Sequence, residues 1–114
     1  MNFKYIYKII DKSEWALAKN KGVYQGSKKD LEDGYIHFSE EVQIKGTLAK
    51  FFKGKENLIL LKIDTDKLEH LLWEQASDGN MFPHLYSPLM IEYVIEEFVI
   101  KKDVKFNFVL IENY

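Results

Sequence analysis

Residues 58–63 read LILLKI, an almost continuous apolar run. A strand covered on one face alternates apolar and polar side chains, whereas a strand buried on both faces does not. The run therefore predicts a central strand with packing layers on both sides. Covering both faces takes most of a 114-residue chain, which has about the size of one ordinary domain. We therefore expect residues 1–114 to form a single domain.

The rest of the chain predicts short strands and two helices. Stretches rich in β-branched and aromatic residues indicate strands over residues 3–10, 23–24, 35–39, 71–74, 91–100 and 105–111, and residues 81–86 are expected to be extended. Helices are expected over residues 14–19, with Ser13 as N-cap and Gly22 as the stop, and over residues 40–52, with Ser39 as N-cap. The polar residues 25–30 predict a turn. Helices early and strands late are typical of an α+β fold.

Composition excludes several classes of protein and site. The chain has no cysteine, so it forms neither disulfides nor thiolate metal sites. Its formal net charge is −2, which argues against a nucleic-acid partner. The basic residues are 16 lysines and no arginine, so a bound anion must be held without arginine's bidentate clamp. The opening residues lack a secretory signal, and no window approaches the roughly 20 apolar residues of a membrane span, so a cytoplasmic protein is expected.

His37 and Ser39 are the first pair of residues suited to chemistry. Residues i and i+2 of a strand point to the same face, so the imidazole and the hydroxyl are expected side by side. Ser39 also falls where a strand passes into a helix, beside N–H groups that bind anions or sugar hydroxyls. The alternative is structural: Ser39 caps the helix and His37 bonds a backbone carbonyl.

His84 and Tyr86 repeat this spacing in a second extended segment. An imidazole and a phenol on one face can stack on a ring or hydrogen-bond a polar ligand. Pro83 restricts the backbone before His84 and, with Pro88, is expected to confine the segment to a sheet edge or a loop. The alternative is a buried Tyr–His pair that fills a polar hole in the core.

Glu74 is the acidic residue expected to accompany the two histidines. In a strand, Trp73 would face the core and Glu74 the opposite side. A carboxylate beside imidazoles can orient a ring or polarise a hydroxyl, and the alternative is an exposed or purely structural glutamate. We expect no metal site, because the histidines lack helical H-x-x-x-H spacing, and the Ser-hydrolase elbow, Rossmann and P-loop signatures are all missing from the sequence.

Taken together, the motifs resemble domain-of-unknown-function family 952, a family of small bacterial and plant proteins. The resemblance rests on G-[FY]-I-H-x-S at residues 34–39 and F-P-H-x-Y at residues 82–86, in this order and spacing. It runs from the first strand to about Ile100. Further matches are residues 6–9, 24–27 and 60–64, Gln43 with Thr47, Trp73 with Glu74, and Pro88 with Leu89.

The resemblance implies an ADP-ribosyltransferase-like fold, in which two small β-sheets pack against each other beside a cleft that holds NAD. It makes NAD the implied cofactor, with no metal. The implied cofactor-binding residues are His37 and Ser39, which match a ribose-gripping element, together with His84 and Tyr86.

The resemblance also implies catalytic roles for Glu74 and His37. ADP-ribosyl-transferring enzymes place their glutamate after the aromatic residue, and that order points instead to Glu92 or Glu96. The acidic residue is therefore left open among these three glutamates.

Three functions remain open at this point. The first is an NAD- or nucleotide-sugar-binding domain that carries out glycosyl or ADP-ribosyl transfer or hydrolysis. The second is a non-catalytic module for a small molecule or a protein, and the third is an accessory domain whose histidine pairs are structural. A small molecule of the nucleotide class is the expected partner. A carboxylate within reach of the space between His37 and Tyr86 favours catalysis. The sequence does not fix the substrate, the acceptor or the oligomeric state.

Overall fold

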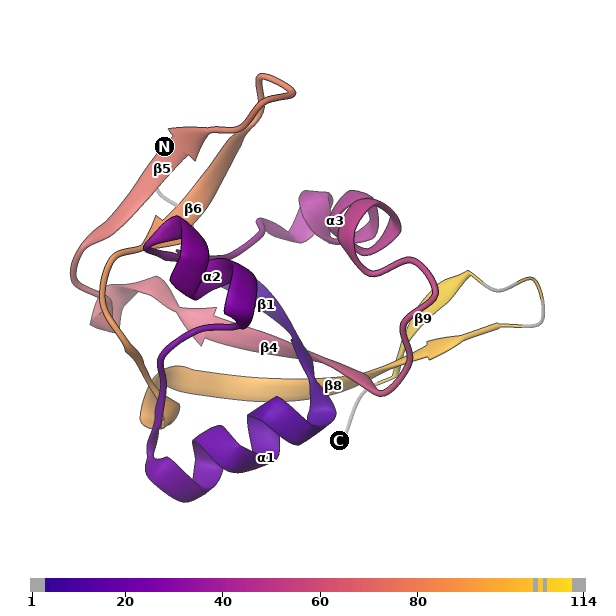
Figure 1. Ribbon diagram of the computed structural model, residues 1–114, viewed down its shortest axis with the longest axis horizontal. Helices are drawn as coiled ribbons and strands as arrows, with labels where there is room; N and C mark the ends of the chain where they lie inside the picture. Colours follow the sequence, from indigo (N-terminus) through magenta and orange to yellow (C-terminus); the bar gives the residue numbers. More distant parts are fainter. Residues whose placement is uncertain (1–3, 104, 106, 112–114) are drawn as a thin grey trace.

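The main sheet of the computed structural model has four antiparallel strands in the order β1-β4-β8-β9 (Figure 1). The structure describes residues 4–103, 105 and 107–111, so Phe3 and Phe106, which were predicted in strands, lie outside it. The strands are β1 (Tyr5–Asp11), β4 (Leu58–Asp64), β8 (Val94–Lys102) and β9 (Phe108–Ile111). β4 pairs with β1 on one side and β8 on the other.

Both faces of β4 are buried, as the apolar run predicted. Ile59, Leu61 and Ile63 belong to one hydrophobic cluster, whereas Leu58 and Leu60 belong to the other. This alternation is the period of two that a strand imposes on its side chains. The central strand predicted from residues 58–63 is therefore confirmed.

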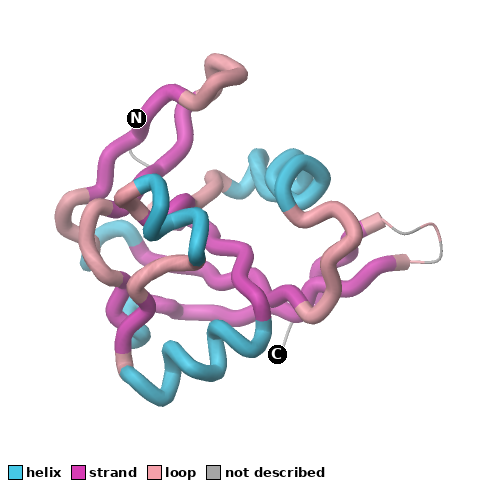
Figure 2. The backbone as a smooth tube through the Cα atoms, in the orientation of Figure 1, coloured by secondary structure: helices cyan, strands magenta, loops and turns pink. Residues whose placement is uncertain are grey.

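Helices cover the two faces of the main sheet (Figure 2). The α-helices are α1 (Lys12–Lys21), α2 (Lys28–Asp33) and α3 (Ile44–Phe51), and the 3₁₀ turns are η1 (Glu41–Gln43), η2 (Thr65–Lys67) and η3 (Ile91–Tyr93). Trp15 and Ala18 of α1 join the cluster on one face, while Ile44 and Leu48 of α3 join the cluster on the other. Among the described residues, none of these helices is long and apolar enough to span a membrane.

Two smaller antiparallel sheets pack on the α1 side of the main sheet. β2 (Val23–Tyr24) pairs with β7 (Leu89–Met90), and β3 (Ile36–His37), β6 (Met81–Leu85) and β5 (Leu71–Gln75) form a sheet in the order β3-β6-β5. Ile36 and Leu85 bury the inner face of the three-stranded sheet against the core. The fold is thus a small mixed one with several antiparallel sheets and few helices, and it has three sheets where two were expected.

The predicted helix caps are corrected in two places. The N-cap of α1 is Asp11, whose carboxylate accepts from the backbone N–H groups of Ser13 and Glu14, while Gly22 ends the helix as predicted. Ser39 is no cap, because its backbone bridges Tyr7 of β1 and η1 begins only after the next residue. The cap of α1 is therefore Asp11, two residues before the predicted Ser13, and Ser39 serves in a sheet bridge and not as a cap.

Pro83 lies in β6, the middle strand of its sheet, and not at an edge or in a loop as predicted. Its carbonyl accepts from the Phe38 N–H at 3.0 Å, so its ring nitrogen also faces Phe38, beyond the last residue of β3. Towards β5, Pro83 opposes Trp73 at a position without ladder hydrogen bonds. The missing N–H therefore costs the sheet little.

Because the two faces of β6 are buried to different extents, truncating a side chain on each face is expected to lower the free energy of unfolding by different amounts. Leu85→Ala is expected to lower the free energy of unfolding by about 2–5 kcal/mol, because it empties a fully buried site. Phe82→Ala removes a half-buried ring on the outer face and is expected to cost about 1–2 kcal/mol. Urea unfolding of both variants measures the difference, and a larger loss for Phe82→Ala would contradict this assignment of faces.

Candidate functional site

Four rings gather on the outer face of the three-stranded sheet, and we call Tyr35, His37, His84 and Tyr86 the ring quartet. His37 of β3 lies directly opposite His84 of β6, and Tyr35 and Tyr86 come two residues further along, just beyond the last pair of this ladder, Ile36 with Leu85. The ring centroids of Tyr35 and His84 are 4.0 Å apart in a stacked arrangement, and those of the two histidines are 5.4 Å apart. Tyr35 also lies 4.6 Å from the His37 ring and 5.2 Å from the Tyr86 ring.

The backbone explains why the two imidazoles come so close. Because the Phe38 N–H bonds to the Pro83 carbonyl, the neighbouring pair His37 and His84 occupies a position without ladder hydrogen bonds. Opposed Cα atoms at such positions approach to about 4.5 Å, which brings their side chains together. The predicted meeting of the two histidines is therefore built into the register of β3 and β6.

Asp30 anchors His37 from below the ring quartet. Its carboxylate is 2% exposed and accepts four hydrogen bonds. Oδ1 accepts from the backbone N–H of His37 at 3.2 Å and lies 2.5 Å from His37 Nδ1. Oδ2 accepts from Lys8 Nζ and from the Ser27 N–H, both at 2.9 Å. A buried carboxylate is stable only with such complete bonding.

Asp30 is held in place by the start of α2. The Ser27 hydroxyl accepts from the Asp30 N–H while the Asp30 carboxylate accepts from the Ser27 N–H, which is a capping box. Gly26, with φ of 121°, precedes it, and a Cβ there would lie 2.8 Å from the Asp30 Cβ. The helix missed within the predicted turn thus serves to present one carboxylate to β1 and β3.

The charges around Asp30 are strongly coupled. Burial alone would raise the pKa of the Asp30 carboxyl, but the hydrogen bond from His37 and the charge of Lys8 hold it well below its ordinary value. Burial lowers the pKa of the Lys8 ammonium, and Asp30 opposes this. Tyr24, whose hydroxyl is buried without a hydrogen-bond partner among the described residues, has a pKa raised by burial and by Asp30. The cluster is therefore most stable with Asp30 ionised.

His37 faces a second carboxylate at its other nitrogen. Nε2 lies 3.0 Å from Oδ2 of Asp33, the last residue of α2, which is also bonded to Lys29 at 3.2 Å. This second contact is an ion-pair distance, whereas the hydrogen bond of the ring is the one between Nδ1 and Asp30.

Glu74 binds the other histidine and a tyrosine through one oxygen. Oε1 lies 2.8 Å from Nδ1 of His84 and accepts from the Tyr86 hydroxyl at 2.6 Å. Glu74 lies on β5 one diagonal step from His84, whose direct partner is Leu72. With Nδ1 bonded to the carboxylate, the neutral ring carries its lone pair on Nε2, which has no hydrogen-bond partner among the described residues.

Protonation follows from these contacts. Burial, aided by the charge of His37, lowers the pKa of His84, and Glu74 opposes the shift without cancelling it. The hydrogen bonds from Tyr86 and His84 lower the pKa of Glu74. The hydrogen bond between Tyr86 and Glu74 raises the pKa of Tyr86 to about 12. At neutral pH the group is therefore a carboxylate, a neutral imidazole and a neutral phenol.

The structure brings together four of the five residues that the sequence proposed, namely His37, Glu74, His84 and Tyr86. The Ser39 hydroxyl is buried and bonds Thr47 Oγ1 of α3 at 2.9 Å, so it does not join the ring quartet.

The two other candidate glutamates lie on different elements. Glu96 of β8 bonds Lys62 on the main sheet, and Glu92 is exposed on η3. Of the three candidate glutamates, Glu74 is therefore the one that contacts the ring quartet.

Sequence reasoning missed Tyr35 and the anchoring residues Asp30, Asp33 and Lys8. Tyr35 carried a usable signal: Y-x-H at residues 35–37 mirrors H-x-Y at residues 84–86, and antiparallel pairing aligns such mirrored segments. The described residues hold no group of three or more metal-ligating side chains suited to a metal ion.

Comparison with known proteins places this arrangement in a family. The chain belongs to the family described as protein of unknown function (DUF952), whose family model matches residues 9–97. The crystal structure of protein CC0527 from Caulobacter crescentus is similar, with a TM-score of 0.86 at 42% identity over 92% of this chain and 93% of that chain. Its solution NMR structure gives a TM-score of 0.82 at 42% identity, covering 92% and 91%. No curated protein matches the chain.

The Asp30 anchor predicts a large and pH-dependent contribution to stability. Asp30→Asn is expected to lower the free energy of unfolding at pH 7 by about 3–5 kcal/mol, because Lys8 stays buried without its carboxylate. Asp33→Asn, which removes the exposed partner of the same histidine, should cost less than about 1 kcal/mol. Equal losses in urea unfolding would contradict the anchor.

The sign of the pH dependence follows from the lowered pKa of Asp30. As the pH falls below about 5, the unfolded chain binds this proton before the folded protein does, so the stabilisation by Asp30 declines. The wild-type protein should therefore lose stability towards pH 3 more steeply than Asp30→Asn does.

The His84–Glu74 pair predicts a measurable titration shift. Because the carboxylate raises the pKa of His84 against the effect of burial, Glu74→Gln is expected to lower that pKa further. Ring-proton NMR across the pH range measures it, with Glu92→Gln as the matched control on η3. An unchanged or higher pKa in Glu74→Gln would show that the carboxylate does not act on this imidazole.

Proposed function

We propose that the outer face of the three-stranded sheet binds NAD or a related ribosyl donor and cleaves its N-glycosidic bond. The observation that carries the proposal is the pair of hydrogen bonds that Glu74 forms with His84 and Tyr86. They put a carboxylate beside both residues expected to contact the ligand. The family resemblance and the ADP-ribosyltransferase-like fold it implies support the same reading. The acceptor in this proposal is water or a nucleophile on another molecule.

The chemistry of the step assigns a role to each group. When the bond between nicotinamide and ribose breaks, its electron pair leaves with nicotinamide and positive charge develops at the ribose C1 carbon. The Glu74 carboxylate stabilises that charge. The acceptor oxygen then bonds to C1, and the free Nε2 of His84 takes its proton. With water as acceptor, the products are ADP-ribose, nicotinamide and a proton.

The exposed rings fit the binding part of this proposal. Tyr86 is 44% exposed and Tyr35 is partly exposed, so a planar ring can stack at the open side of the ring quartet. The site carries the carboxylates of Asp33 and Glu74, which favour a cationic nicotinamide ring over a phosphate group at this point. The diphosphate of NAD would then extend away from Glu74.

Glu74→Gln separates chemistry from binding. It is expected to reduce nicotinamide release from NAD by at least about 100-fold while weakening NAD binding by no more than about tenfold, because the Asp33 carboxylate remains at the site. Chromatography of released nicotinamide gives the rate, and the rise in melting temperature with NAD concentration gives the affinity. Glu92→Gln is the control and should behave as wild type. Absence of both release and thermal shift with NAD would refute the proposal.

A non-catalytic binding module is the second candidate, and the contacts of His37 favour it. Nδ1 of this ring is hydrogen-bonded to the buried Asp30 and Nε2 lies 3.0 Å from Asp33, so both nitrogens are occupied by protein carboxylates and not open to a substrate. This alternative predicts a thermal shift with a nucleotide and no released nicotinamide in the wild-type protein.

A further inference from the structure

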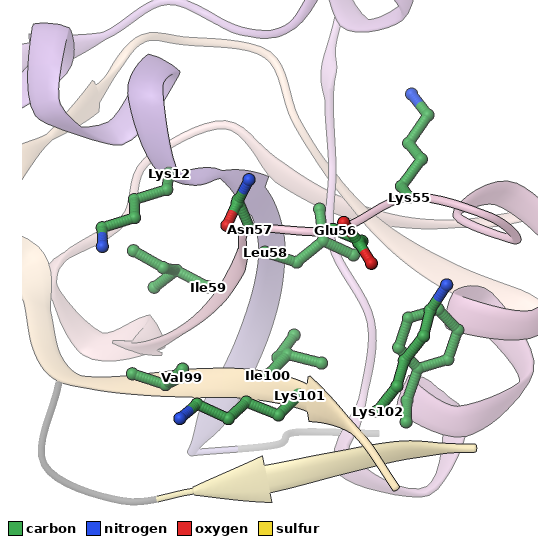
Figure 3. Close-up of a pocket in the computed structure, with 11 residues that line it drawn as sticks. Lys12, Lys55, Glu56, Asn57, Leu58, Ile59, Val99, Ile100, Lys101 and Lys102 are labelled. Carbon is green, nitrogen blue, oxygen red and sulfur yellow. The ribbon is translucent and has the colours of Figure 1, made fainter. Parts of the chain in front are cut away.

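A hollow of about 350 Å³ opens where β4 begins and β8 ends, and it shares no residue with the ring quartet (Figure 3). Lys12 at the start of α1 and residues 55–57 before β4 border it on one side. The end of β8 and Phe108 of β9 border it on the other. The hollow thus lies at a sheet end that the proposed function does not use.

The backbone leaves a donor group in this hollow. The last pair between β4 and β8 is Leu58 with Ile100, whereas Lys101 and Lys102 continue β8 and pair only with β9. Asn57, in the left-handed region with φ of 59°, turns the chain away at this point. Consecutive strand residues direct their N–H groups to opposite edges, so one of the two lysine N–H groups points away from β9, towards the edge where β4 no longer pairs.

Positive charge is concentrated around the hollow. Lys12, Lys55, Lys101 and Lys102 line it together with a single acidic residue, Glu56, although the chain as a whole carries a net charge of −2. Among the described residues, Lys55, Lys101 and Lys102 have no carboxylate within ion-pair distance. These three ammonium groups therefore form no direct ion pair with a described carboxylate, although the charge of Lys55 also acts on Asp11 and Glu14.

Aromatic rings hold two of these lysines at the rim. Lys102 Nζ lies 5.4 Å from the centre of the Phe108 ring, and Lys55 Nζ lies 5.8 Å from that of Phe52. The floor between them is apolar and includes Leu58 and Ile100, which are almost fully buried in the same hydrophobic cluster against which Phe52 and Phe108 pack. An occupant therefore meets ammonium groups at the rim and hydrocarbon below.

We propose that this hollow binds a phosphate monoester carried on a small apolar body. The dianionic phosphate matches several unpaired ammonium groups and one backbone N–H, and lysine binds phosphate as a point charge where arginine is lacking. The apolar body covers the floor and the Phe108 ring. An inorganic anion alone gains only the first of these two contributions.

Phenyl phosphate is the probe, and amide NMR on the whole protein is the measurement. It is expected to shift the amide signals of residues 55–59 and 99–102, with phenol and inorganic phosphate each binding at least about tenfold more weakly. The double variant Lys101→Gln and Lys102→Gln should weaken binding about tenfold, and added salt should weaken it in the wild type. Lys28→Gln with Lys45→Gln, which removes two lysines elsewhere, should leave it unchanged.

Two results would overturn the proposal. One is the absence of amide chemical-shift changes in this region at about 10 mM phenyl phosphate, a concentration well above a dissociation constant of about 1 mM. The other is binding that persists unchanged in the Lys101→Gln and Lys102→Gln double variant, whose unperturbed amide spectrum reports that it is folded. Neither result depends on NAD cleavage at Glu74, so this site and the proposed function stand or fall separately.

Discussion

The buried carboxylate of Asp30 is the contact on which the site depends. Its four hydrogen bonds join three separate parts of the chain: Lys8 on the main sheet, Ser27 at the start of α2, and His37 on β3. β3 is only two residues long, so its ladder with β6 cannot fix it firmly by itself. The carboxylate holds the outer edge of β3 through the His37 backbone and the ring of the same residue, and in this way sets one wall of the ring quartet.

Sequence patterns predicted the parts of the fold whose burial follows a regular period. The run at residues 58–63 identified the central strand, because two covered faces require apolar side chains at nearly every position. α2 was missed because its six residues bury only Asp30, so it shows no apolar stripe. Its S-x-x-D capping box at residues 27–30 was the available signal. The number of sheets could not be predicted either. β2 and β7 are only two residues long, and the residues that pair are far apart in the sequence.

Site residues could be predicted where they follow the two-residue period of one strand. The prediction failed where the chain passes from one sheet to another. The i, i+2 rule placed His84 and Tyr86 on one face correctly, and its mirror on β3 is Tyr35 and His37. The same rule failed for Ser39, because after Phe38 the backbone leaves the three-stranded sheet and bridges β1 of the main sheet. A single sequence does not show this transfer, and so the hydroxyl was assigned to the wrong surroundings.

The imidazoles of His37 and His84 are so close that positive charge on both rings would be repulsive. The carboxylates around them are arranged differently for each ring. His37 is hydrogen-bonded to Asp30 through Nδ1 and has Asp33 within ion-pair distance of Nε2, whereas His84 bonds only Glu74 and its other nitrogen has no partner among the described residues. The lowered pKa of His84, to which the charge of His37 contributes, agrees with this division. Among the described residues, the exposed side of this pair therefore presents one ring nitrogen that no protein group occupies, Nε2 of His84, beside the Glu74 carboxylate.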